Sequence, residues 1–280
     1  IFLPGDVAPQ EVRDCLHEEL AQALGPLNDL YRLPDSVFND DNFHTVLTGF
    51  DMLILAATYA TELRSGMSPD AVAAELPRVL DRLNPRGRGG GAFRPDPTPR
   101  AWIDAIETAL GPSASPTRRR LAAREAVAIA SDERWSDTRL AFSLYALGRL
   151  TLGSEPELAL ASFLQAGSIY RAEPGTQLQA AHISMQLAAF ALSAGQLDVA
   201  VEIVDRNLRP VAEAENAALL STLLMVKAEA LTALGRTGEA AEVRLDSLGW
   251  ARYGFGTDDE VRARAREIAA LRPGGDGDPT

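Results

Sequence analysis

Apolar residues recur every three or four positions along most of this chain, a spacing that predicts amphipathic helices almost throughout. Between about residues 99 and 272 the pattern breaks at Gly153, Gly195 and Gly235, with gaps of 42 and 40 residues. Each glycine ends an apolar segment, and a short polar turn leads from it into another helix. The pattern therefore predicts three helical hairpins in series.

This repeat resembles the tetratricopeptide pattern, in which small residues let two antiparallel helices pack closely. Ala159, Ala200 and Ala240 stand at matching places in the second helix of each unit. One hairpin cannot bury its apolar faces alone, so we expect the units to stack into an α-solenoid. Helices near residues 118–130 and 259–271 would cap or extend the array. The period exceeds the usual 34 residues, which indicates longer helices or loops.

A stretch rich in Gly, Pro and Arg marks the main domain boundary, at residues 84–98. We interpret it as a linker between a helical domain at residues 1–83 and the repeat domain at residues 99–272. The tail at residues 273–280 contains Pro, Gly and Asp but no apolar side chain, and it is expected to be disordered.

The first helix has a leucine-rich apolar stripe and an opposite polar face. Its apolar positions are Val12, Leu16, Leu20, Ala23, Leu24 and Leu27. Glu18, Gln22 and Gly25 fall on the other side. A polar face opposite an apolar stripe usually faces water, so this helix is expected to bury its leucines.

The polar face also has the frame of a zinc-peptidase helix, HExxHxxGxxH, with every histidine replaced. When the frames are aligned on the glycine, the first two ligand positions hold Glu18 and Gln22, and the third holds Asn28 or Asp29. Glu19 occupies the position of the general base. Zinc prefers histidine nitrogen and cysteine sulfur, whereas these side chains offer only oxygen, which suits calcium or magnesium better. We therefore expect no bound metal or other cofactor.

The following residues extend this resemblance to residues 13–67, about a fifth of the chain. Ser36-Val37-Phe38-Asn39 stands where metzincin peptidases have their Met-turn, and Thr48, Asp51 and Tyr59 resemble the closing helix of matrixin-like enzymes. The whole run resembles a bacterial family of uncharacterised function in the metzincin-like clan. The residues that carry the resemblance are Arg13, Cys15, Glu18, Glu19, Gln22, Gly25, Asn28, Asp29, Ser36, Phe38, Asn39, Asp40, Gly66 and Met67.

This resemblance implies a degenerate metzincin-like helical domain that has lost its zinc ligands. In that fold a sheet and a long helix precede the active-site helix, whereas here the helix begins about eight residues from Ile1. We therefore expect that this chain is processed or belongs to a longer gene product. Thr48 and Asp51 also form a capping-box pair, which gives them a structural reason to be present.

Composition narrows the possible partners. The formal net charge of −12 argues against nucleic acid or an anionic membrane as the main partner. No apolar run is long enough to span a bilayer. Cys15 is the only cysteine, so an internal disulfide is impossible. The family resemblance favours export to the periplasm over a cytoplasmic location.

The leading hypothesis is a non-catalytic protein-binding or scaffold protein, a pseudopeptidase whose helical repeat surface contacts a protein partner. One alternative is a metal-dependent hydrolase, with Glu19 as general base and oxygen ligands drawn from Glu18, Gln22, Asn28 and Asp29. Another is a subunit of a larger assembly. The sequence identifies neither the partner nor the residues that contact it.

Overall fold

The computed structural model describes residues 5–27, 30–40, 42–88 and 97–274. In these ranges the chain is helical, and the only β-type contact is an isolated bridge between Leu30 and Asn39. The mainly α fold class predicted from the hydrophobic pattern is confirmed. Within the same ranges, no helix is both long enough and apolar enough to cross a membrane.

Among the described residues of the N-terminal part there are three α-helices: α1 (Pro9–Ala23), α2 (Gly49–Thr58) and α3 (Pro69–Leu83). Gly25 follows α1 with φ at 150°, a conformation that L side chains rarely adopt and glycine tolerates. A Cβ atom on Gly25 would lie 2.8 Å from Cγ2 of Thr58, so the C-terminal ends of α1 and α2 are close together. A short 3₁₀ turn (Pro85–Gly87) follows α3.

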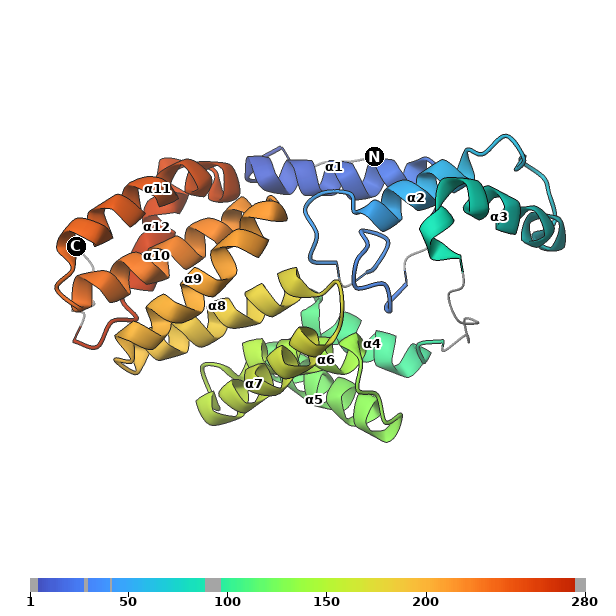
Figure 1. Ribbon diagram of the computed structural model, residues 1–280. Coiled ribbons are helices and arrows are strands. Elements are labelled where there is room, and N and C mark those ends of the chain that lie inside the picture. Colours follow the sequence, from blue (N-terminus) through green and yellow to red (C-terminus); the bar gives the residue numbers. More distant parts are fainter. Residues whose placement is uncertain (1–4, 28–29, 41, 89–96, 275–280) are drawn as a thin grey trace.

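Within residues 97–274, which the structure describes, nine further helices form the repeat part. They are α4 (Arg100–Leu110), α5 (Pro116–Asp132), α6 (Thr138–Thr151), α7 (Pro156–Ala172), α8 (Gln177–Ser193), α9 (Leu197–Glu213), α10 (Ala217–Ala233), α11 (Thr237–Phe255) and α12 (Asp258–Ala269). Each helix packs against the next, and α8 also packs against α10, which gives the solenoid-like stack visible in Figure 1. In that view the array curves from α4 to α12, and the segment between α1 and α2 lies inside the curve.

The three glycines lie between the two helices of each predicted hairpin. Gly195 and Gly235 have φ values of 72° and 76°, the left-handed conformation that closes a helix and favours glycine. Gly153 has no such φ, so the first hairpin turns differently. The helices of these hairpins have 14 to 19 residues, which accounts for the long period.

Close helix approach at small residues holds the stack together. A Cβ atom on Gly148 would lie 2.6 Å from the ring of Phe163, and one on Gly254 would lie 2.5 Å from the backbone nitrogen of Ala218. Trp102, Phe163 and Ile183 are fully buried in the core of the first hairpins. Ala159, Ala200 and Ala240, the small residues that mark the repeat, are also fully buried, as close packing of the two helices of a hairpin requires.

The first helix, α1, faces the opposite way from the one its apolar stripe indicates. Leu16, Leu20 and Leu24 are 39%, 51% and 42% exposed, whereas Gln10 and Ala21 are buried. The expectation that its leucines are buried is therefore wrong. Of the polar positions opposite the stripe, Glu18 and Gln22 are half-buried and Gly25 is exposed. The first turns of α1 are held against the array by hydrogen bonds of Gln10 and Arg13, as described next.

Candidate functional site

The first turns of α1 dock on the turn between α9 and α10 through Gln10 and Arg13. Arg13 donates from Nη2 to the backbone oxygen of Glu215 at 2.8 Å and to Oγ1 of Thr45 at 3.0 Å. Its Nη1 forms an ion pair with the Glu215 carboxylate at 3.1 Å. Its guanidinium also lies 5.4 Å from the ring centre of Tyr253 in α11. One arginine thus ties α1 to the turn between α9 and α10 and to α11.

Gln10 completes this contact by capping α10. Its side-chain oxygen accepts the backbone N–H of Ala218 at 2.9 Å, and its amide donates to Asn216 Oδ1 at 3.2 Å. Asn216 is itself the N-cap of α10 and accepts the backbone N–H of Leu219. A helix N-terminus leaves backbone donors without partners, so Gln10 stabilises α10 from a distant part of the chain.

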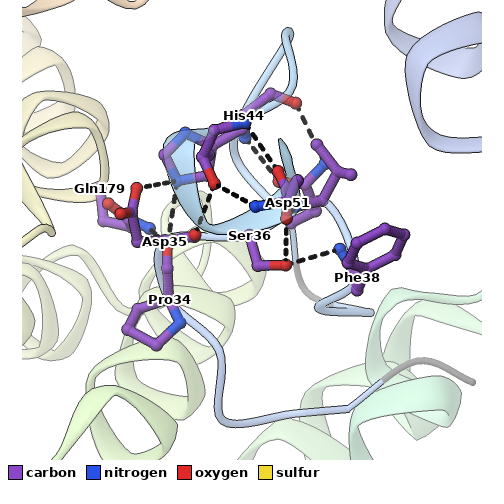
Figure 2. A network of polar contacts seen from close by, with 10 residues as sticks. Pro34, Asp35, Ser36, Phe38, His44, Asp51 and Gln179 are labelled. Atoms are coloured by element: carbon purple, nitrogen blue, oxygen red, sulfur yellow. Dashed lines mark hydrogen bonds and ion pairs between the residues drawn. The ribbon is translucent and has the colours of Figure 1, made fainter. Parts of the chain in front are cut away.

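A buried carboxylate, Asp51, organises the segment between α1 and α2. It accepts hydrogen bonds from Ser36 Oγ at 2.6 Å, from the backbone N–H of Val37 at 3.2 Å and from the backbone N–H of Thr48 at 2.7 Å (Figure 2). The side-chain oxygen of Thr48 in turn accepts the backbone N–H of Asp51. This second bond completes the capping box that the sequence predicts. Ser36 and Asp51, two positions of the metzincin resemblance, therefore have a structural role here.

The same segment is fastened to α8 through the carbonyl oxygen of Pro34. That oxygen lies 2.5 Å from Nε2 of Gln179 and 3.0 Å from Nε2 of His44. Figure 2 shows both side chains converging on it, with Asp35 forming an ion pair to His44 at 3.7 Å. These contacts hold residues 34–44 against the array.

Phe43 is the apolar anchor of the segment. Its ring packs against Phe142 and Tyr145 of α6, Tyr170 of α7 and His182 of α8, with centroid distances of 5.0 to 6.3 Å. The inside of the array's curve, where a repeat protein often holds a partner, is thus occupied by the chain's own residues.

An open cleft of about 480 Å³ lies where α1, this segment and the array meet. It mixes carboxylates, amides, histidines and aromatic rings, the kind of composition that marks candidate ligand sites. Its lining residues come from α1 (Gln10, Asp14 and Glu18), from the segment (Asp40 and residues 42–45) and from the array (Leu110, Phe142, Tyr145, Arg149, His182 and Asn216).

Two groups in the cleft have strongly shifted pKa values. Burial raises the pKa of the Asp14 carboxyl to about 6, although Gln10 and Arg13 counteract it. Burial lowers the pKa of His182 to about 4, with smaller contributions from the positive charges of Arg149 and His44. At neutral pH the cleft therefore contains a neutral imidazole and an Asp14 that ionises less readily than usual.

The residues that the sequence suggested as metal ligands or as a general base do not lie together. Glu18 lines the cleft, whereas Glu19, one position on, is exposed and is not part of the lining. Gln22 is partly buried outside the lining, and Asn28 and Asp29 lie outside the described residues. In the described part of the chain, no three His, Cys, Asp or Glu side chains gather in an arrangement that could hold a metal.

Sequence analysis missed the residues that shape this cleft. Asp14, Arg149 and Gln10 belong to no motif, and they meet only because α1 folds back onto helices more than 100 residues away. His182, which also belongs to no motif, packs on Phe43 and lines the cleft. The peptidase-like frame drew attention to α1, but to Glu18, Glu19 and Gln22 rather than to Gln10 and Asp14.

Comparison with known proteins adds one finding. No curated protein matches the chain, and no solved structure matches it. The profile of a family described as a protein of unknown function (DUF2927) matches residues 1–78, which include α1, α2, the segment between them and most of α3. A DUF2927 domain thus forms the first part of this chain.

Proposed function

We propose that this chain is a non-catalytic protein-binding protein whose partner contacts the outward face of α1 and α2. The observation that carries the proposal is the orientation of α1, which places Gln10 and Arg13 against the array and leaves its leucines exposed. Leu16, Leu20 and Leu24 are 39% to 51% exposed, and Leu27 is 72% exposed. A row of exposed leucines on one helix is a feature of interaction surfaces.

The exposed surface continues from α1 onto α2. The Tyr59 hydroxyl donates to the backbone oxygen of Leu24 at 2.7 Å, and Tyr59 and Met52 are 63% and 57% exposed. With the leucines, these side chains present apolar surface on the order of 600 Å², the upper end for the largest patch on a monomer. The exposed Glu19, three residues after Leu16 and therefore its neighbour on the helix surface, favours a partner with basic groups around its apolar surface.

In this proposal the domain that resembles a metzincin peptidase is retained for its surface, and the tetratricopeptide-like array acts as its support. The inside of the array's curve is occupied by residues 34–44, which favours the outward face as the contact surface. Permanent membership of a larger assembly would use the same face, with a partner that purifies in a fixed ratio.

A pair of matched leucines tests the proposal. Leu20 on α1 and Leu164 on α7 are both 51% exposed, so lysine at either position should be similarly tolerated. Tagged wild-type chain, Leu20→Lys and Leu164→Lys are used to capture proteins from the source cells, and the captured proteins are quantified by mass spectrometry. The affinity of each purified partner is then measured directly.

We expect at least one protein that wild type and Leu164→Lys retain and that Leu20→Lys loses, with a fall in affinity of at least about tenfold. Capture of no specific protein, or equal loss with both variants, would reject the proposal. Circular dichroism of both variants excludes misfolding as the cause.

A second candidate, the metal-dependent hydrolase, is favoured by one observation, the position of Glu18 in the cleft. It predicts about one bound metal per chain and its loss when Glu18 and Gln22 are replaced by alanine. Elemental analysis of the purified chain after dialysis measures this directly. Metal at background level would reject the hydrolase.

A further inference from the structure

The leucine face of this chain consists of six exposed side chains on α1, α2 and the residues that follow each helix: Leu16, Leu20, Leu24, Leu27, Met52 and Tyr59. Leu16, Leu20 and Leu24 succeed one another at intervals of four residues. They therefore form a ridge about 12 Å long on one side of α1. Met52 and Tyr59 are seven residues apart, which places them on one side of α2.

The C-terminal ends of α1 and α2 meet beside this ridge. The Tyr59 hydroxyl donates to the backbone oxygen of Leu24 at 2.7 Å, and a Cβ atom on Gly25 would lie 2.8 Å from Cγ2 of Thr58. Figure 1 shows α2 beside one end of α1. A helix carries a partial negative charge at its C-terminus, and neither helix has a basic residue in its last turn. The first basic residue after α2 is Arg64, six positions beyond Thr58.

Acidic side chains add to the negative charge of these two helix ends. The sequence of α1 contains four carboxylates and a single arginine, Arg13, which bonds Glu215 and Thr45. Glu19 is exposed, and Leu16 and Ala23 are its neighbours on the helix surface, three residues before it and four after it. The leucine face therefore combines an apolar ridge with negative charge, which is complementary to a partner surface that is apolar and basic.

Among the recurring ways in which proteins bind a segment of a partner, the docking of a helix fits this surface best. Strand addition needs an exposed sheet edge, and in residues 5–27, 30–40 and 42–88 the only β-type contact is the isolated bridge between Leu30 and Asn39. Recognition of a polyproline helix needs a groove lined by aromatic rings, whereas the leucine face contains one aromatic side chain, Tyr59. A ridge with four-residue spacing packs well into the groove between two ridges of another helix.

We infer that the partner binds through a basic amphipathic helix, an inference that rests on the function proposed above. The apolar stripe of this helix packs on Leu16, Leu20 and Leu24. Its Lys or Arg side chains lie at Glu19 and at the converging ends of α1 and α2. Glu19, which holds the position of the general base in the peptidase-like frame, thus contacts the partner and takes part in no reaction.

The test uses the full chain and three labelled peptides of about 18 residues, long enough for several helical turns. The first has leucines at i, i+3, i+4 and i+7 and lysines elsewhere, the second has glutamate in place of lysine, and the third is a scramble of the first without the stripe. Fluorescence anisotropy at physiological salt gives each Kd. We expect a Kd of about 50 μM or below for the leucine–lysine peptide, and at least about tenfold weaker binding of the other two.

Two pairs of variants separate the apolar contact from the charged one. Leu20→Lys should weaken the leucine–lysine peptide at least about tenfold, whereas the equally exposed Leu164→Lys should not. Glu19→Lys should weaken the same peptide at least about fivefold and strengthen the leucine–glutamate peptide. Glu125→Lys changes the net charge of the chain by the same amount, on α5 at the opposite side of the molecule in Figure 1, and should change either Kd less than about twofold. Circular dichroism shows that each variant is folded.

The inference is overturned if the leucine–lysine peptide binds no more tightly than its scramble, or if Leu20→Lys or Glu19→Lys leaves its Kd unchanged. Two other occupants of the leucine face would also overturn it. A second copy of the chain would appear in sedimentation as a dimer that Leu20→Lys dissociates. A lipid surface would appear as binding to phosphatidylcholine vesicles that Leu20→Lys abolishes.

The capture experiment described above tells this inference apart from the proposed function. A captured protein that Leu20→Lys loses, but that Glu19→Lys retains and the leucine–lysine peptide does not displace, would leave the proposed function in place and reject the basic helix. Capture of no specific protein would reject the proposed function itself, whatever the peptides show.

Discussion

Replacing Asp14 by asparagine should stabilise the folded chain at neutral pH. Burial raises the pKa of this carboxyl from 3.8 to about 6, so the folded state disfavours the ionised form. Asparagine has nearly the same shape and cannot ionise. The variant therefore removes an unfavourable buried charge while leaving the α1 contacts of Gln10 and Arg13 in place.

The difference between the pKa of Asp14 in the folded and the unfolded state sets both the size of this stabilisation and the pH range over which it develops. The two pKa values correspond to at most about 3 kcal/mol, and because the Asp14 side chain is 28% exposed, water screening reduces this to about 1–2 kcal/mol. Below pH 4 both states are protonated and the two proteins should differ little. Between about pH 4 and pH 6 the unfolded wild-type chain ionises first, so wild type progressively loses stability relative to the variant. Above pH 6 the difference should be constant.

Urea unfolding followed by circular dichroism, at intervals from pH 4 to pH 8, measures this difference. Asp246→Asn on α11, an exposed aspartate outside the cleft, serves as the control and should track wild type at every pH. Glu18, Asp40, His44, His182 and Arg149 also line the cleft, but they are common to all three proteins. A stability difference that does not vary with pH, or a variant less stable than wild type at pH 7, would refute the reasoning.

Three further changes probe the packing, each measured by the same unfolding assay. Gly254→Ala should lower the free energy of unfolding by about 1–3 kcal/mol, because the new Cβ would lie 2.5 Å from the α10 backbone. Gly249→Ala, in the same helix, meets no atom within 4 Å and should raise the free energy of unfolding by about 0.5–1 kcal/mol. Equal effects at the two glycines would contradict the close approach of α10 and α11. Asp51→Ala should cost about 3 kcal/mol because it leaves buried donors without an acceptor, and a neutral result would exclude its role as an organiser. Phe43→Ala should cost about 2–3 kcal/mol and increase protease cleavage within residues 34–44, and unchanged cleavage would show that other contacts hold the segment.

Most of the fold could be predicted because its determinants are local. The helical period and the glycines at 153, 195 and 235 mark the hairpins, and Thr48 and Asp51 mark the start of α2. Such signals act over a few residues, so they can be read without knowing the tertiary structure. The repeat period also predicted the order of packing, since neighbouring hairpins in sequence are neighbours in space.

The orientation of α1 and the composition of the cleft could not be predicted, because their determinants are distant in sequence. Gln10 contacts Asn216 and Ala218, more than 200 positions away, and Arg13 contacts Glu215. A hydrophobic pattern shows that a helix has two faces, but the burial of one face depends on what the rest of the chain offers it. Here the start of α10 and the turn before it offer hydrogen-bond donors and acceptors, and Gln10 and Arg13 of α1 bind them.

This orientation bears directly on function. Burying a leucine side chain fully contributes about 1.5–3 kcal/mol, yet Leu16, Leu20 and Leu24 remain 39% to 51% exposed and Leu27 is 72% exposed. If α1 served only to stabilise the array, turning these leucines inward would contribute several kcal/mol more. A helix held by its polar side, with Asp14 in a position that raises its pKa, is poorly explained by stability alone. We therefore expect Leu20→Ser to change the free energy of unfolding by less than about 0.5 kcal/mol while abolishing partner capture, and a larger loss of stability would show that the leucine face belongs to the core.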